Sequence, residues 1–107
     1  MNLPKVVSAL VKAQDNYDSI AYANCFSETA VVVDEGKTYN GKKEIKSWIA
    51  GANEKYKTIM KPIAFETQGA VCVLSAEISG TFDGSPVILE YCFEIIDGLI
   101  QSLKITG

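Results

Sequence analysis

The C-terminal half of the chain is divided by glycines into apolar segments, and this division constrains the fold more than any other feature. Gly69, Gly84 and Gly98 separate segments rich in β-branched and aromatic residues, and the last two glycines each follow an aspartate. Such segments are typical of strands, and Asp-Gly between them is typical of a tight hairpin. The pattern predicts an antiparallel meander. Its four expected strands cover 59–68, 70–82, 86–96 and 99–106.

The N-terminal half instead shows apolar residues at helical spacing. It predicts helices over 4–14, from about 18 to 27, and over 41–56, with a short β-branched strand over 30–33 that ends at Asp34. Ile20, Ala23 and Phe26 are the expected inner face of the second helix. Asp18 is a good cap for that helix, and Glu44 is placed to fold back on the start of the third.

These elements predict an α+β fold in which three N-terminal helices pack on a curved antiparallel sheet. The 107 residues suit a single domain over 1–107. Pro62 cannot donate a ladder hydrogen bond, so we expect an irregular or edge position for the strand that contains it. A curled sheet covered by helices leaves a cone with an internal pocket, where we expect the functional site.

Composition argues against several classes of function. The chain carries a net charge of −3 and has neither arginine nor histidine, which argues against nucleic-acid binding and against a zinc site. Cys25, Cys72 and Cys92 lack the paired spacing of a disulfide framework. Reduced thiols suit the cytoplasm. No stretch is long enough to span a membrane, and neither a signal peptide nor a need for a metal or organic cofactor is indicated.

Three short motifs, in this order and spacing, are similar to those of one family. They are AVVVD at 30–34, NGKKEI at 40–45 and DGLI at 97–100, and Phe26 precedes them where that family commonly has an aromatic residue. The chain resembles, over nearly its whole length, the ketosteroid-isomerase-like (SnoaL-like) branch of the NTF2-like superfamily. The resemblance implies the cone fold and a homodimer that forms through the outer face of the sheet.

The resemblance also implies a role for Asp34, which matches the general base of ketosteroid isomerases. An ungapped alignment through Asp34 puts Leu10 and Phe93 at the positions of the two oxyanion donors, a tyrosine and a protonated aspartate. Neither replacement can donate a hydrogen bond. An aspartate before Glu35 and Gly36 is equally a turn-forming residue that faces water.

Strand alternation supplies the other candidate residues. Tyr91 is expected on the pocket face of its strand, where its hydroxyl would be a hydrogen-bond donor beside Asp34. The predicted ligand contacts are apolar or aromatic residues on the inner faces of strands and helices: Leu10, Phe26, Trp48, Ala76, Ile78 and Phe93. Simple filling of the core is the alternative for each of them.

Two functions remain open from the sequence. One is an enzyme that abstracts a proton from, or adds water to, a small apolar carbonyl compound without a cofactor, with Asp34 as base and Tyr91 as donor. The other is a module that binds a hydrophobic ligand or only dimerises. The outer sheet face, which we expect to carry Val71, Val73 and Cys92, fits the predicted homodimer.

Overall fold

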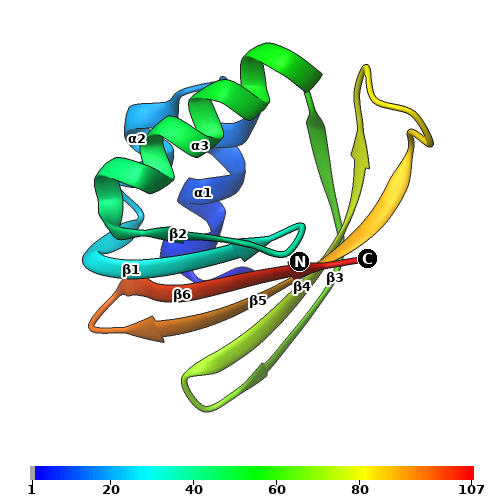
Figure 1. Cartoon of the computed structure of the whole chain (residues 1–107). Helices are drawn as coiled ribbons and strands as arrows, with labels where there is room; N and C mark the ends of the chain where they lie inside the picture. Colours follow the sequence, from blue (N-terminus) through cyan, green and yellow to red (C-terminus); the bar gives the residue numbers. More distant parts are fainter. Residues whose placement is uncertain (1) are drawn as a thin grey trace.

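The computed structural model describes residues 2–107 as helices packed against a curved sheet (Figure 1). In chain order the elements are α1 (Lys5–Asp15), α2 (Ser19–Ala23), β1 (Phe26–Asp34), β2 (Lys37–Asn40), α3 (Gly41–Tyr56), β3 (Ile59–Gln68), β4 (Val71–Ser79), β5 (Val87–Ile96) and β6 (Leu99–Thr106). None of the helices in this part of the chain is long and apolar enough to cross a membrane.

The six strands form one sheet in the order β2-β1-β6-β5-β4-β3. Neighbouring strands run antiparallel except β1 and β6, which run parallel with Val32 beside Leu103. The predicted α+β class is confirmed, but the expectation of a wholly antiparallel sheet is wrong. Turn signals in a sequence report only strands joined by a hairpin, whereas α3 and most of the meander separate β1 from β6.

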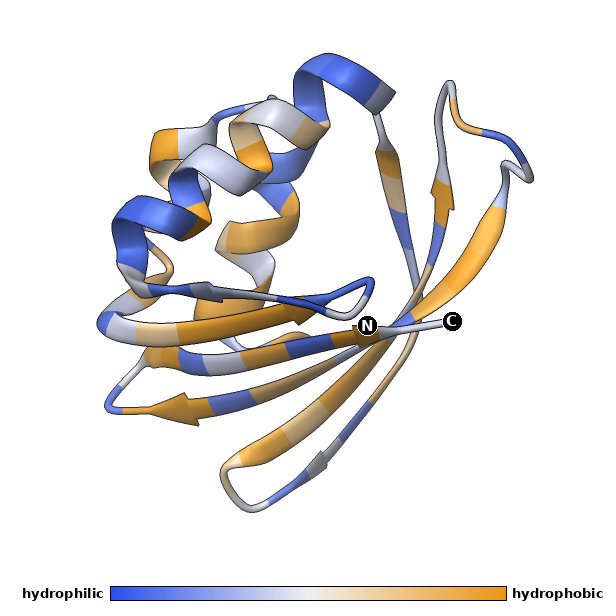
Figure 2. Ribbon diagram, viewed as in Figure 1, coloured by the Kyte–Doolittle hydropathy of each residue, from blue (hydrophilic) through white to orange (hydrophobic). Residues whose placement is uncertain are grey.

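The core lies between the helices and the concave face of the sheet (Figure 1). Buried and partly exposed residues alternate along β4, and the middle of β5 follows the same pattern. Figure 2 shows that these strands carry mostly apolar residues, with polar ones among them. The predicted inner faces of these strands are confirmed by their buried residues: Cys72, Leu74, Ala76, Ile78, Tyr91 and Phe93.

The boundary between α2 and β1 differs from the prediction. α2 ends at Ala23, and Phe26 already belongs to β1, where it is fully buried and pairs with Ile100. Ile20, expected on the inner face, is 59% exposed, and Tyr22 is buried instead. Ala23 is buried as predicted, so only the inward position of Ile20 is wrong. A helix of five residues is too short to establish a helical period in the sequence.

The strand β2 was not predicted, because its sequence KTYN has no apolar alternation. It pairs with β1 through a turn at Glu35 and Gly36, which adopt φ values of 53° and 74°. Positive φ at both central residues is the geometry of a tight hairpin. β1 therefore ends at Asp34, directly before the turn.

The two Asp-Gly signals have different outcomes. Asp97 and Gly98, with φ values of 53° and 78°, form the predicted two-residue hairpin between β5 and β6. Gly84 instead lies in a longer loop, because β4 ends at Ser79 and β5 begins only at Val87. The backbone N–H of Thr81 donates to the carbonyl of Tyr56 in α3 at 2.9 Å, so this segment bonds to the helix end and leaves the strand ladder.

Three local predictions are confirmed. The carboxylate of Asp18 accepts a hydrogen bond from the backbone N–H of Ala21 at 3.0 Å and caps α2. The carboxylate of Glu44 accepts from the backbone N–H of Asn40 at 2.9 Å at the start of α3. β3 lies at the edge of the sheet, and its register shifts after Pro62.

Two glycine substitutions should change stability in opposite directions. Among residues 2–107, leaving aside chain neighbours and the helix's own backbone, no atom lies within 4 Å of a Cβ added at Gly98 or Gly51, so backbone conformation decides the outcome. Gly98→Ala should lower the free energy of unfolding by about 1–2 kcal/mol, since φ is positive there. Gly51→Ala, within α3, should raise it by about 0.5–1 kcal/mol. Urea unfolding measures both, and a shift in the same direction would contradict the assigned turn.

Candidate functional site

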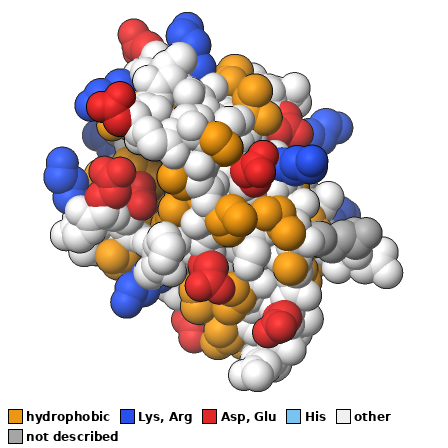
Figure 3. All heavy atoms as spheres, turned by 90° about the vertical axis from the view of Figure 1, so that its right-hand side faces the viewer, with side chains coloured by type: hydrophobic (Ala, Val, Ile, Leu, Met, Phe, Trp, Pro, Cys, Tyr) orange, Lys and Arg blue, Asp and Glu red, His pale blue; other side chains and the backbone are white. Residues whose placement is uncertain are grey.

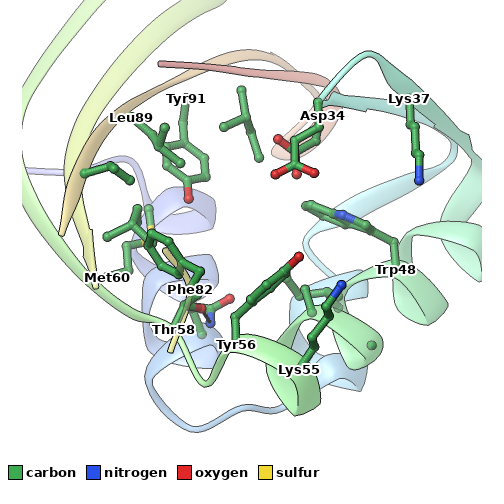
Figure 4. Close-up of a pocket in the computed structure, with 18 of the residues that line it drawn as sticks. Asp34, Lys37, Trp48, Lys55, Tyr56, Thr58, Met60, Phe82, Leu89 and Tyr91 are labelled. Atoms are coloured by element: carbon green, nitrogen blue, oxygen red, sulfur yellow. Dashed lines mark hydrogen bonds between the residues drawn. The ribbon is translucent and has the colours of Figure 1, made fainter. Parts of the chain in front are cut away.

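A cavity of about 520 Å³ lies between the helices and the concave face of the sheet (Figure 4). Each helix and each strand contributes at least one residue to its lining. Apart from Asp34, the charged lining residues are exposed and so mark the mouth: Glu35, Lys37, Lys55 and Asp83. The interior is mostly apolar and aromatic, which suits a small apolar ligand.

Pairing across three strands brings Asp34 and Tyr91 to the same part of the cavity. Val32 is buried beside Leu103 of β6, and alternation puts Asp34, two residues later, on the same inner face. Ile105 follows Leu103 by two residues in the same way and pairs with Tyr91 of β5. Asp34, Ile105 and Tyr91 all line the cavity, and Figure 4 shows Asp34 and Tyr91 directed into it.

Asp34 is half-buried, and its surroundings change its acidity. Burial raises the pKa of the Asp34 carboxyl above its ordinary value, and the neighbouring Glu35 carboxylate adds to the rise. The backbone N–H of Glu35 and the indole N–H of Trp48 favour the ionised form and oppose that rise of the pKa. The result is a carboxylate that accepts a proton more readily than an exposed aspartate, as a general base requires.

Two buried phenols, Tyr22 and Tyr91, line the same cavity. Burial raises the pKa of both, and the negative charge of Asp34 raises each further; for Tyr22, proximity to Tyr91 and Cys25 contributes as well. Both phenols therefore keep their protons at neutral pH. Within residues 2–107 neither hydroxyl makes a hydrogen bond, so both remain able to donate to a ligand.

Aromatic contacts hold Trp48 in place beside Asp34. The Trp48 ring stacks on Tyr39 with 5.4 Å between centroids and meets Tyr22 edge-on at 6.1 Å. Tyr22 in turn contacts Phe26 at 5.8 Å. The indole is thus fixed between β2 and α2, with its N–H near the Asp34 carboxylate (Figure 4).

The structure separates the predicted site residues into two groups. Asp34, Tyr91, Trp48 and Ile78 line the cavity together. The other four are fully buried in the core and are not among the described residues that line it: Leu10, Phe26, Ala76 and Phe93. They pack behind the lining, and ligand contact by them stays a prediction.

Sequence reasoning missed Tyr22 and Gln14 as cavity residues. Both sit on helices whose orientation toward the sheet depends on tertiary packing. In the sequence, Tyr22 is one of several tyrosines whose hydroxyl could serve a site, and Gln14 has no feature that indicates a site. Among residues 2–107, no three acidic, cysteine or histidine side chains gather as ligands for a metal ion.

No protein-family model matches the chain, and no curated protein does. Among solved structures, a protein from Sinorhizobium meliloti named "putative polyketide cyclase" is 35% identical in sequence. The match covers 97% of this chain and 95% of that protein, with a TM-score of 0.94.

Two further structures have lower identity and show the fold alone. A protein from Catenulispora acidiphila with a ketosteroid isomerase-like fold, in complex with trimethylamine, is 18% identical with a TM-score of 0.88, over 99% of this chain and 87% of that one. An NTF2-like protein of unknown function from Cytophaga hutchinsonii is 15% identical with a TM-score of 0.80, over 94% of this chain and 85% of that one.

Replacing Asp34 should stabilise the chain in a pH-dependent way. Because the Asp34 pKa is higher in the folded than in the unfolded chain, its contribution to stability is greatest when protonated and falls as pH rises through the folded-state value. Asp34→Asn should therefore raise the melting temperature at pH 7, with the gain shrinking toward zero below about pH 4. Asp83→Asn, at the exposed mouth, is the control. An equal gain at all pH values would contradict the raised pKa.

Proposed function

The chain belongs to the ketosteroid-isomerase-like (SnoaL-like) branch of the NTF2-like superfamily, and on that basis we propose that its cavity catalyses proton transfer at a carbon next to a carbonyl group. The substrate is a small apolar carbonyl compound, and the reaction needs no organic cofactor. One observation supports this most: a half-buried carboxylate with a raised pKa, Asp34, shares an apolar cavity with the two protonated phenols of Tyr22 and Tyr91.

In the proposed step, the Asp34 carboxylate takes a proton from the carbon beside the substrate carbonyl. The electron pair of the broken C–H bond forms a C=C bond, and the carbonyl oxygen becomes an enolate oxygen. Tyr91 and Tyr22 donate hydrogen bonds to that oxygen, which is where negative charge develops. Because burial keeps both phenols protonated, they donate to the enolate and do not compete with Asp34 as bases.

The enolate has two chemically balanced continuations. If the substrate carries a β,γ C=C bond, the intermediate is a dienolate, and Asp34 can return its proton to the γ-carbon, which moves the double bond into conjugation with the carbonyl. Alternatively the enolate carbon attacks a second carbonyl of the same molecule, a ring closes, and the new alkoxide takes the proton from Asp34. The polyketide cyclase name of the Sinorhizobium meliloti protein favours ring closure in this chain as well.

Hydrogen exchange into a simple ketone tests the proposal. We expect the protein to accelerate exchange of the acidic carbon-bound hydrogens of 2-tetralone in D2O above the buffer rate, measured by proton NMR. Asp34→Asn should lower the acceleration by about 100- to 10,000-fold through loss of the base. Tyr91→Phe should lower it by about 100- to 1,000-fold through loss of an oxyanion donor.

Glu54→Gln, an exposed change on α3 outside the cavity, is the matched control and should keep the wild-type rate. Wild-type exchange in Asp34→Asn would rule out Asp34 as the base. Binding of the ketone to both proteins, detected by thermal shift without exchange in either, would favour the non-catalytic ligand-binding module.

We also propose a homodimer that forms through the outer face of the sheet. One row across this face runs Glu66, Val73, Cys92, Lys104 and Val33 on neighbouring strands. A two-fold axis between Val73 and Cys92 would place Lys104 of one copy against Glu66 of the other, with Val73 and Cys92 between them. On the side drawn in Figure 3, hydrophobic side chains are likewise exposed between charged ones.

Mass in solution at low micromolar concentration tests the dimer. The wild-type chain should have the mass of two copies, and Val73→Glu should have the mass of one, because the substitution puts two like charges near the axis. Circular dichroism confirms that the variant is folded. A wild-type monomer at that concentration would end the proposal.

We also propose a cytoplasmic location for the chain. Cys25, Cys72 and Cys92 are all free thiols in the described part of the chain. Free cysteines of this kind suit a reducing compartment.

A further inference from the structure

One end of the cavity is polar, and the proton-transfer step does not use it. Gln14, at the end of α1, is only 5% exposed and still lines the cavity. Its side-chain Nε2 donates to Asn53 Oδ1 of α3 at 3.0 Å and to Thr58 Oγ1 at 2.7 Å. Gln14 and Thr58, which both line the cavity, are called the polar end here.

The polar end has hydrogen-bonding capacity that the protein leaves unused. Both N–H groups of the Gln14 amide are bonded, yet within residues 2–107 its carbonyl oxygen Oε1 accepts no hydrogen bond. Thr58 Oγ1 accepts from Gln14, so its own hydrogen is directed elsewhere. No buried side-chain nitrogen or oxygen atom in the described part of the chain lacks a partner, so this unbonded oxygen is open to the cavity. The pair therefore suits a ligand group that both donates and accepts.

The polar end lies away from Asp34. Figure 4 shows Thr58 and Asp34 on opposite sides of the cavity, with Met60, Phe82 and Leu89 along the lining between them. These three side chains carry no hydrogen-bonding group, so a ligand that spans the cavity along them has an apolar body with a polar group at each end.

We propose that the polar end binds a hydroxyl group of the ligand. The hydroxyl donates to Gln14 Oε1 and accepts from the Thr58 hydroxyl, which satisfies both groups at once. This assignment of the two ends rests on the proposed function, which puts the substrate carbonyl at Asp34. The ligand class is then an apolar carbonyl compound that carries a hydroxyl at the end remote from the reacting carbon. Gln14 and Thr58 are then the residues that determine specificity.

Three probes that differ only at the remote end test this. 6-Hydroxy-2-tetralone donates and accepts, 6-methoxy-2-tetralone accepts only, and 2-tetralone does neither. Titration calorimetry should give about tenfold tighter binding of the hydroxy compound than of either analogue, the size expected of a buried hydrogen bond. Measuring in the Asp34→Asn variant as well separates this binding from any chemistry.

Variants at the polar end complete the test. Thr58→Val and Gln14→Met should each remove the preference for the hydroxy probe, and Thr58→Ser should keep it. Because Gln14→Met also deprives Asn53 of its partner and endangers folding, the comparison of Thr58→Val with Thr58→Ser decides.

Equal affinity for the three probes, no binding of any at millimolar concentration, or an unchanged preference in Thr58→Val would overturn the proposal. A hydroxyl preference without any exchange of carbon-bound hydrogens by the wild type would instead count against the proposed catalysis alone.

Discussion

The parallel pairing of β1 with β6 is the constraint on which the rest of the site depends. With Val32 beside Leu103, the inner face of β1 continues that of β5 and β6, and its last residue, Asp34, reaches the same region of the cavity as Tyr91. A slip of one residue would turn Asp34 to the outer face, since side chains alternate along a strand. The turn into β2 then ends the strand where its carboxylate meets the cavity and Trp48.

The cavity combines apolar walls with polar groups that the folded chain leaves incompletely satisfied. Burial raises the pKa of Asp34 and of both buried phenols, and the carbonyl of Gln14 accepts no hydrogen bond within residues 2–107. The half-buried carboxylate of Asp34 lowers stability when the site is empty. A chain selected only for stability would replace it, so its presence beside free hydrogen-bonding groups fits a site kept for a ligand or a reaction.

The parts of the fold that local sequence determines were predictable. The strands 59–68 and 99–106 begin and end where their apolar pattern does, and alternation placed Tyr91 on the inner face. Contacts between elements distant in the chain left no such signal. The parallel partner of β1 is one example, and the inward position of Tyr22 on a helix of five residues is another. Tyr22 therefore escaped prediction, whereas Trp48, on the long and strongly periodic α3, did not.

The acidity of Asp34 tests most directly whether the β1–β6 register places this carboxylate in the cavity. Carboxyl carbon NMR should follow its titration in the wild type and in Glu35→Gln. We expect a midpoint above the ordinary aspartate value of about 3.9, a lower midpoint in Glu35→Gln because a negative neighbour is lost, and a higher one when 2-tetralone fills the cavity. A midpoint at the ordinary value, unmoved by either change, would mean that Asp34 faces water as a turn residue.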